Sequence, residues 1–212
     1  DDTDAAPGTL GDRVTDMALR ALLALALRLP YDRRIPFMGA VFRRIVAPVA
    51  GYRRRALTNL RDTCPDLSPV EQRRIADGVA DNFGRSVAEI WSGPAFSARI
   101  QAADPLTGPG LAPLLAAVAA GKPVILAVAH FGNYDAMRAA LVGRGLTVGA
   151  VFRPMDNPYF NARYTAAIRR IAEPLFPRTR AGTVEMLRFL RAGGVVALGT
   201  DQHYRSGAPL TF

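Results

Sequence analysis

Between residues 123 and 201 the sequence alternates between apolar runs of strand length and segments with helical periodicity. The apolar runs cover residues 123–129, 146–152 and 194–199. The helical patterns cover residues 135–142, 159–171 and 184–191. Strands that alternate with helices form a mainly parallel sheet covered by helices, so the predicted fold class is α/β. The continuous apolar run 123–129 predicts a buried parallel strand, and residues 173–176 are expected to form only a short extended link.

The part of the chain before this pattern is predicted to be helical and to begin with an amphipathic arm. A narrow polar stripe recurs at helical spacing, at Arg13, Asp16, Arg20, Ala24 and Arg28, and leucines and alanines form a wide apolar face around the rest of the helix. Eight arginines and no acidic residue lie between Arg33 and Arg61. Alternating apolar and basic clusters suit helices in the headgroup layer of an anionic membrane. The alternative is an arm packed on its own domain with solvated arginines.

We therefore assign residues 1–56 to a membrane-associating arm and residues 57–212 to the α/β domain. Ser68 and Glu71 form a capping-box sequence that predicts a further helix to about Trp91. Another helix is expected over residues 111–120. Because the sequence ends in the mainly apolar residues Pro-Leu-Thr-Phe and no capping element follows them, we expect the C-terminal part of the domain to be missing.

Composition narrows the classes of partner and cofactor. The net charge is +9, which favours acidic partners such as phosphates, an anionic membrane or an acidic protein. Nucleic acid is a weaker candidate because the basic run lacks interleaved surface aromatics. One cysteine and two histidines predict neither a disulfide nor a zinc cluster. Sequences typical of a nucleophile elbow, a phosphate-binding loop or a dinucleotide-binding turn are missing, so no metal and no cofactor are expected.

Three polar side chains follow predicted strands and are candidates for a common site. Ligands of open parallel sheets bind beyond the carboxyl ends of the strands. His130, Arg153 and Asp201 all fall at or just past such ends, so we expect them to converge. Arg153 suits bidentate binding of phosphate, in a loop held rigid by Pro154, although a surface ion pair is the alternative. Asp201 and Gln202 are expected either to orient a hydroxyl or a loop or to form a simple turn.

His130 and Asp135 are the predicted catalytic pair. On a continuous helix five residues would separate them by about 140°, so they meet only if the chain turns at Gly132 and Asn133. Asp135 would then lie in the first turn of a helix, where the helix dipole favours its ionised form. An ionised carboxylate beside the imidazole would orient the ring and make His130 a general base.

These residues resemble a known superfamily. The sequence His-Phe-Gly-Asn-Tyr-Asp at residues 130–135 is similar to the His-x4-Asp/Glu motif of lysophospholipid acyltransferases. Several other blocks look like those of the branch that contains the lauroyl and myristoyl acyltransferases of lipid A biosynthesis. They lie at residues 59–60, 65–68, 82–85, 152–154, 157–158, 190–194 and 201–202. The resemblance covers the chain from about residue 10 to its end, and Asp135 stands where this branch usually has Glu.

The resemblance implies transfer of an acyl chain from an acyl carrier protein thioester to a hydroxyl of a lipid A precursor, a phosphorylated glycolipid. The expected place is the cytoplasmic face of the inner membrane, with peripheral or N-terminal attachment. It implies His130 and Asp135 as catalytic residues. The substrate-binding residues would be Phe131, Gly132, Asn133, Arg153, Pro154, Asn157, Asp201 and Gln202. The alternatives are an acyltransferase for another glycolipid or a lysophospholipid, and a catalytically inactive membrane-binding relative.

Overall fold

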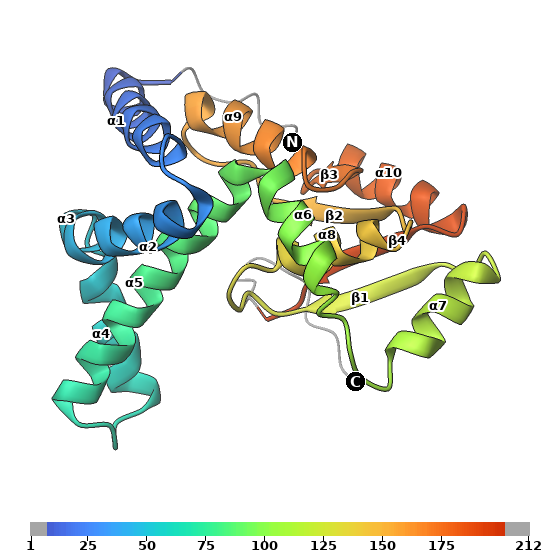
Figure 1. Ribbon diagram of the computed structural model, residues 1–212, viewed down its shortest axis with the longest axis horizontal. Coiled ribbons are helices and arrows are strands. Elements are labelled where there is room, and N and C mark those ends of the chain that lie inside the picture. The colour runs from blue at the N-terminus through green and yellow to red at the C-terminus, as the bar shows by residue number, and fades with distance from the viewer. Residues whose placement is uncertain (1–7, 202–212) are drawn as a thin grey trace. The chain divides into compact units, whose positions relative to one another are not determined.

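The computed structural model describes residues 8–201, which form two compact units (Figure 1). The first unit contains the chain up to Asp104 and, in addition, Met155–Ile171. The second contains Pro105–Pro154 and the chain from Ala172 onward. The chain therefore leaves the second unit after the second strand and returns to it before the third.

The first unit is helical. Its elements are α1 (Leu10–Leu27), α2 (Tyr31–Val41), the π-helical turn η1 (Phe42–Val46), α3 (Ala47–Val49), α4 (Tyr52–Thr63), α5 (Pro69–Ser92), α6 (Pro94–Ala103) and α9 (Pro158–Arg169). The buried core joins α1, α2 and α5 through side chains such as Leu23, Met38 and Ala88. At Gly84 an added Cβ would lie 2.5 Å from the Met38 carbonyl oxygen, so the missing side chain permits the close packing of α2 on α5.

The predicted helix starting after Ser68 is confirmed. The Ser68 hydroxyl accepts the Glu71 backbone N–H, and the Glu71 carboxylate accepts the Ser68 backbone N–H at 3.1 Å. This capping box satisfies two donors that the first helical turn leaves without a partner. α5 extends for 24 residues and packs against α2 and α4 of the first unit.

α1 is amphipathic, as predicted. However, a residue of its polar stripe is buried, and several of its apolar side chains are exposed. Asp16 is buried on α1 and forms an ion pair with Arg163 of α9. The apolar side chains Leu10, Val14 and Met17 are exposed. None of the helices within residues 8–201 combines the length and the apolar character needed to cross a membrane.

The second unit is built on a four-stranded parallel sheet with the strand order β1-β4-β2-β3. The strands are β1 (Val124–Val128), β2 (Val148–Phe152), β3 (Leu175–Pro177) and β4 (Val195–Gly199). The helices are α7 (Leu111–Ala119), α8 (Asp135–Gly143) and α10 (Arg180–Arg191). The predicted α/β class and parallel sheet are thus confirmed. The expected extended link at residues 173–176 is instead a short strand, because Leu175 and Phe176 pair with β2 and are buried in the sheet.

Helices cover both faces of this sheet. α7 and α8 pack on the face that carries Val124, Leu126 and Val148, whereas α10 packs on the face that carries Val196. The prediction that the first strand is buried is wrong, because Val124, Leu126 and Val128 are only half-buried and the two residues between them are exposed. β1 lies at the sheet edge, and Ile125 is 58% exposed. Ile125 is the register partner of Val196, so it points to the α10 face at a position that α10 does not cover.

Candidate active site

His130 and Asp201 follow neighbouring strands in the same register. β1 pairs with β4 so that Val128 lies opposite Gly199, and Thr200 donates its backbone N–H to the Val128 carbonyl at 3.0 Å. Two residues beyond this pair on each strand are His130 and Asp201. The parallel pairing therefore places both side chains at the carboxyl edge of the sheet, where ligands bind in such folds.

The Asp201 carboxylate holds His130 by two hydrogen bonds. The His130 backbone N–H donates to Asp201 Oδ2 at 2.7 Å, and His130 Nδ1 lies 2.7 Å from Asp201 Oδ1. A carboxylate accepts, so the neutral imidazole that fits this contact carries its proton on Nδ1 and leaves Nε2 with a lone pair. Both side chains are partly exposed, at 40% and 37%, so the ring is open to a ligand.

The same hydrogen bonds set the charge of Asp201. Donation by the His130 side chain and backbone lowers the pKa of the Asp201 carboxyl below its ordinary value. The carboxylate is therefore ionised throughout the neutral range. An ionised partner at Nδ1 fixes the orientation of the ring and stabilises the imidazolium that forms when Nε2 takes a proton.

Two neighbours fit closely around the imidazole. An added Cβ at Gly199 would lie 2.5 Å from His130 Cε1, so a residue without a side chain at this position makes room for the ring. The Tyr134 ring stands edge-on to the imidazole with 5.2 Å between the ring centroids. Neither contact was predicted from the sequence: the Gly199 contact depends on the placement of β4 beside β1, and the Tyr134 contact depends on the course of the turn at Gly132.

Asp135 lies in the first turn of α8, as predicted, but its side chain enters the protein interior. The chain turns at Gly132, which has a φ of 59°, and the Asn133 side chain accepts the Asp135 backbone N–H at 3.1 Å. Asp135 is 2% exposed, and its Oδ1 accepts a hydrogen bond of 2.8 Å from Arg138 Nη1. Within residues 8–201 the ring of His130 is thus bonded to Asp201, whereas the carboxylate of Asp135 is bonded to Arg138.

Arg138 is a buried cation that the sequence did not single out. Besides Asp135, it donates from Nη2 to the Ala172 carbonyl at 2.8 Å and more weakly to the Val148 carbonyl at 3.4 Å. It therefore links α8 to β2 and to the segment that precedes β3. Burial raises the pKa of Asp135, and the Arg138 guanidinium only partly opposes this effect. Asp135 Oδ2 is also buried and has no hydrogen-bond partner among the described residues.

The other predicted site residues occupy different surroundings. Phe131 is 90% exposed beside His130, and Arg153 and Pro154 are exposed directly after β2. Asn157 belongs to the first unit, where its side chain caps α9 and donates to the Asp12 carbonyl at 2.8 Å. Gln202 lies outside the described residues. Within residues 8–201 no cluster of three or more His, Cys, Asp or Glu side chains is placed to hold a metal ion.

Fold and site together define an α/β protein with a carboxylate-bound histidine at the carboxyl edge of a parallel sheet. The family of bacterial lipid A biosynthesis acyltransferases matches residues 12–210 of the chain, which is nearly its whole length. The chain belongs to this family and is an acyltransferase of lipid A biosynthesis. A comparison with curated proteins found no match.

Proposed function

We propose that the protein transfers a fatty acyl chain from an acyl carrier protein thioester to a hydroxyl of a lipid A precursor, with His130 as the general base. The observation that carries this proposal is the 2.7 Å contact between His130 Nδ1 and Asp201, which leaves Nε2 available to accept a proton. Family membership supports the acyl-transfer chemistry. A positioned base that removes the hydroxyl proton accelerates such a transfer.

The proposed reaction needs no nucleophile from the protein. His130 Nε2 takes the proton of the acceptor hydroxyl while the hydroxyl oxygen attacks the thioester carbonyl carbon. A carbon–oxygen bond forms, the carbon–sulfur bond breaks, and the thiolate of the carrier leaves with the proton held by His130. Asp201 orients the ring and stabilises the imidazolium between these steps. In this scheme Asp135 acts indirectly, through the buried pair with Arg138 that anchors α8.

Arg153 is the proposed ligand for a phosphate of the glycolipid acceptor. It is exposed directly after β2, a neighbour of β4, and a guanidinium binds phosphate bidentately. Phe131, Gly132 and Asn133 follow His130 and are proposed to contact the substrates, as are Pro154, Asn157 and Gln202. The excess of positive charge, +9 over the chain, suits both an acidic carrier protein and a phosphorylated acceptor.

We further propose that residues 1–56 attach the protein to the cytoplasmic face of the inner membrane. Many exposed large apolar side chains of the first unit lie on α1, where Leu10, Val14 and Met17 are each at least 60% exposed. Arginines at residues 43, 44, 53, 54 and 55 follow in the sequence. Exposed apolar side chains next to basic clusters favour binding in the headgroup layer of an anionic membrane.

The test of the proposed function supplies the protein with labelled acyl carrier protein and a tetra-acylated lipid A precursor. We expect label to appear in a penta-acylated product, and acyl-CoA in place of the carrier protein to be a poor donor. Transfer only to another glycolipid or to a lysophospholipid would favour the alternative acceptor classes. Absence of transfer to every acceptor, with the protein folded, would indicate a catalytically inactive relative.

The first prediction compares the two carboxylates. Asp201→Asn is expected to lower kcat by about 10²-fold or more, because the neutral amide no longer favours the imidazolium or fixes the ring. Since the pKa of Asp201 lies below its ordinary value, the carboxylate is ionised at all neutral pH values, and the loss should be similar on both sides of pH 7. Steady-state rates at several pH values measure this. A larger kcat loss in Asp135→Asn than in Asp201→Asn, at equal thermal stability, would instead assign the orienting role to Asp135.

The second prediction concerns the space that Gly199 leaves for the imidazole. In Gly199→Ala the new methyl group would lie 2.5 Å from His130 Cε1, so the ring must shift from its position beside Asp201. We expect kcat to fall about 10²-fold, because small displacements of a catalytic group are costly. Gly110→Ala is the matched control, since no atom lies within 4 Å of its added Cβ. Equal rates for the two variants would contradict the proposed position of the base.

A further inference from the structure

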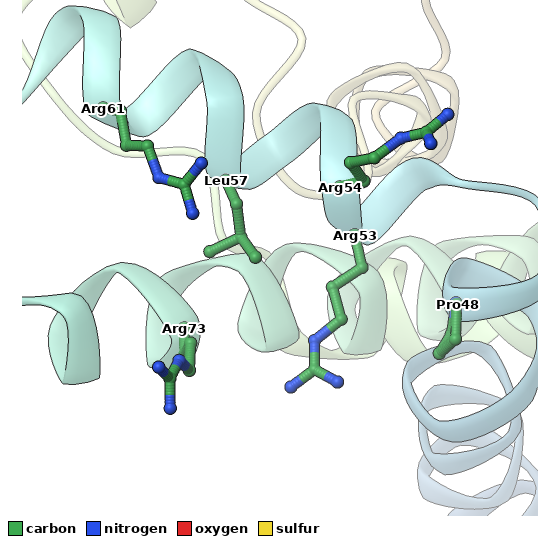
Figure 2. A pocket seen from close by; sticks show the side chains of 6 residues that line it. All are labelled: Pro48, Arg53, Arg54, Leu57, Arg61 and Arg73. Carbon is green, nitrogen blue, oxygen red and sulfur yellow. The ribbon is translucent and has the colours of Figure 1, made fainter.

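The first unit carries a pocket lined mainly by arginines, between α3, α4 and α5. It has a volume of about 560 Å³, and its lining residues are Pro48, Arg53, Arg54, Leu57, Arg61 and Arg73. Figure 2 shows Leu57 and the guanidinium groups of Arg53 and Arg61 pointing from α4 towards α5, whereas Arg73 projects from α5 on the side turned away from α4. Arg54 points the other way in this view. The lining contains no acidic residue.

Most of the positive charge of this pocket is not neutralised. Arg53 is held by Asp77, with Nε 2.9 Å from Oδ1 and Nη2 3.1 Å from Oδ2. In the part of the chain that the structure describes, Arg61 and Arg73 form no ion pair with a carboxylate. Two guanidinium groups without an ion-pair partner therefore line the same pocket as the anchored Arg53, and such a set suits an anion with several oxygen atoms, such as a phosphate.

An apolar groove adjoins the arginine-lined pocket and shares Arg53 with it. The groove has a volume of about 330 Å³. Its apolar walls include Phe42, Ala47, Tyr52, Val79, Ala80 and Phe83. Val79 and Phe83 are each 56% exposed, which is unusual for large apolar side chains unless a partner covers them. Each volume lies in the range of small-molecule sites.

We propose that the two cavities together bind one anionic phospholipid of the membrane. The phosphate occupies the pocket between Arg53, Arg61 and Arg73, and an acyl chain lies in the groove along Val79 and Phe83. This inference rests on the proposed membrane association but not on acyl transfer. An acidic protein helix would match the arginines and leave the groove uncovered, whereas an amphiphile with an anionic head matches both parts.

The head-group half of the proposal is tested by co-sedimentation with vesicles. The full chain is expected to bind vesicles of equimolar phosphatidylglycerol and phosphatidylcholine more tightly than vesicles of phosphatidylcholine alone. Arg61→Gln with Arg73→Gln should weaken binding to the anionic vesicles about tenfold or more, since each basic residue near the surface contributes several-fold. The matched control is Arg180→Gln with Arg188→Gln, which removes the same charge from exposed positions of α10. Arg61→Lys with Arg73→Lys should recover part of the binding.

The acyl-chain half is tested with a fluorescent label at Val79→Cys in a Cys64→Ser background. Phosphatidylglycerol with brominated acyl chains is expected to quench this label. Val70→Cys is the control, because nine residues along α5 correspond to the opposite face of the helix, and Val70 is also exposed. Quenching at residue 79 should disappear in the Arg61 and Arg73 double glutamine variant.

Several results would overturn this inference. Equal binding losses in the two double glutamine variants would show a response to net charge alone. Equal quenching at residues 70 and 79 would show adsorption without a defined site. If the Arg61 and Arg73 variant kept vesicle binding and lost only transfer from the acyl carrier protein, the pocket would be a protein-docking site. No binding of the wild type to either vesicle would remove the proposed membrane association as well, whereas acyl transfer would be untouched.

Discussion

Replacing His130 with alanine is expected to reduce acyl transfer by about 10²- to 10⁴-fold, the usual contribution of a positioned general base. The effect should fall on kcat, because the imidazole acts on the reacting hydroxyl, while KM for the two substrates changes little. Initial rates with labelled acyl carrier protein and the tetra-acylated precursor measure both parameters.

The controls for this variant separate catalysis from folding. His130 is partly exposed and lies after the end of β1, so its truncation should leave the midpoint of thermal unfolding nearly unchanged. Transfer at the wild-type rate by a folded His130→Ala protein would rule out His130 as the base. The double variant His130→Ala with Asp201→Asn should be no slower than His130→Ala alone, since Asp201 is proposed to act only through the ring.

Arg138→Met is expected to destabilise the protein by about 3–5 kcal/mol, the usual effect of removing one partner of a buried ion pair. Asp135 would keep its charge in an interior where Oδ2 already lacks a partner, and the Ala172 carbonyl would lose its donor. Urea unfolding, monitored by circular dichroism, measures the free energy of unfolding. Asp135→Leu combined with Arg138→Met should recover part of the loss, because no uncompensated charge remains.

This variant also has a defined pH dependence. Burial raises the pKa of Asp135 in the folded wild type, and loss of the Arg138 guanidinium removes the group that opposes this rise. A carboxyl with a raised folded pKa binds its proton more tightly in the folded state, so stability increases as the pH falls from neutral towards the ordinary carboxyl value. The destabilisation of Arg138→Met should therefore be smaller at mildly acidic pH than at pH 7. An equal loss at both pH values would mean that Asp135 does not respond to the missing cation.

Much of the architecture follows from local patterns. The helix capped by Ser68 and the three strands read from apolar runs are confirmed, because caps and periodicity act over a few residues. The short strand β3 and the exposed side of β1 were missed. Both depend on strand order, which is a long-range property: Leu175 is buried only because β2 lies beside it, and Ile125 is exposed only because β1 lies at an edge.

The dependence on strand order also explains which parts of the candidate site could be predicted. The position of His130 at the end of an apolar strand could be predicted from the sequence, and so could the turn at Gly132. The convergence of His130 with Asp201 was also predicted, because both follow strands, but their direct hydrogen bond was not, and Asp135 was expected to orient the ring instead. Only the placement of β4 next to β1 brings the two together. Arg138 was also missed, since an arginine on a helix is usually solvated and its burial depends on the carbonyls of distant segments.

α9 belongs to the first unit, although the strands before and after it in the sequence belong to the second. This arrangement has a consequence for folding during synthesis. α9 is part of the helical first unit, yet about fifty residues of the second unit precede it in the chain after Asp104. A ribosome that adds about 5–20 residues per second would deliver the partner of Asp16 several seconds after α6 is complete. Meanwhile Asp16 lacks its ion-pair partner Arg163, and the side chains that α9 covers stay accessible. The N-terminal helices should therefore be open to proteases or chaperones until α9 leaves the exit tunnel, and ribosome-bound chains that end before residue 155 should show this.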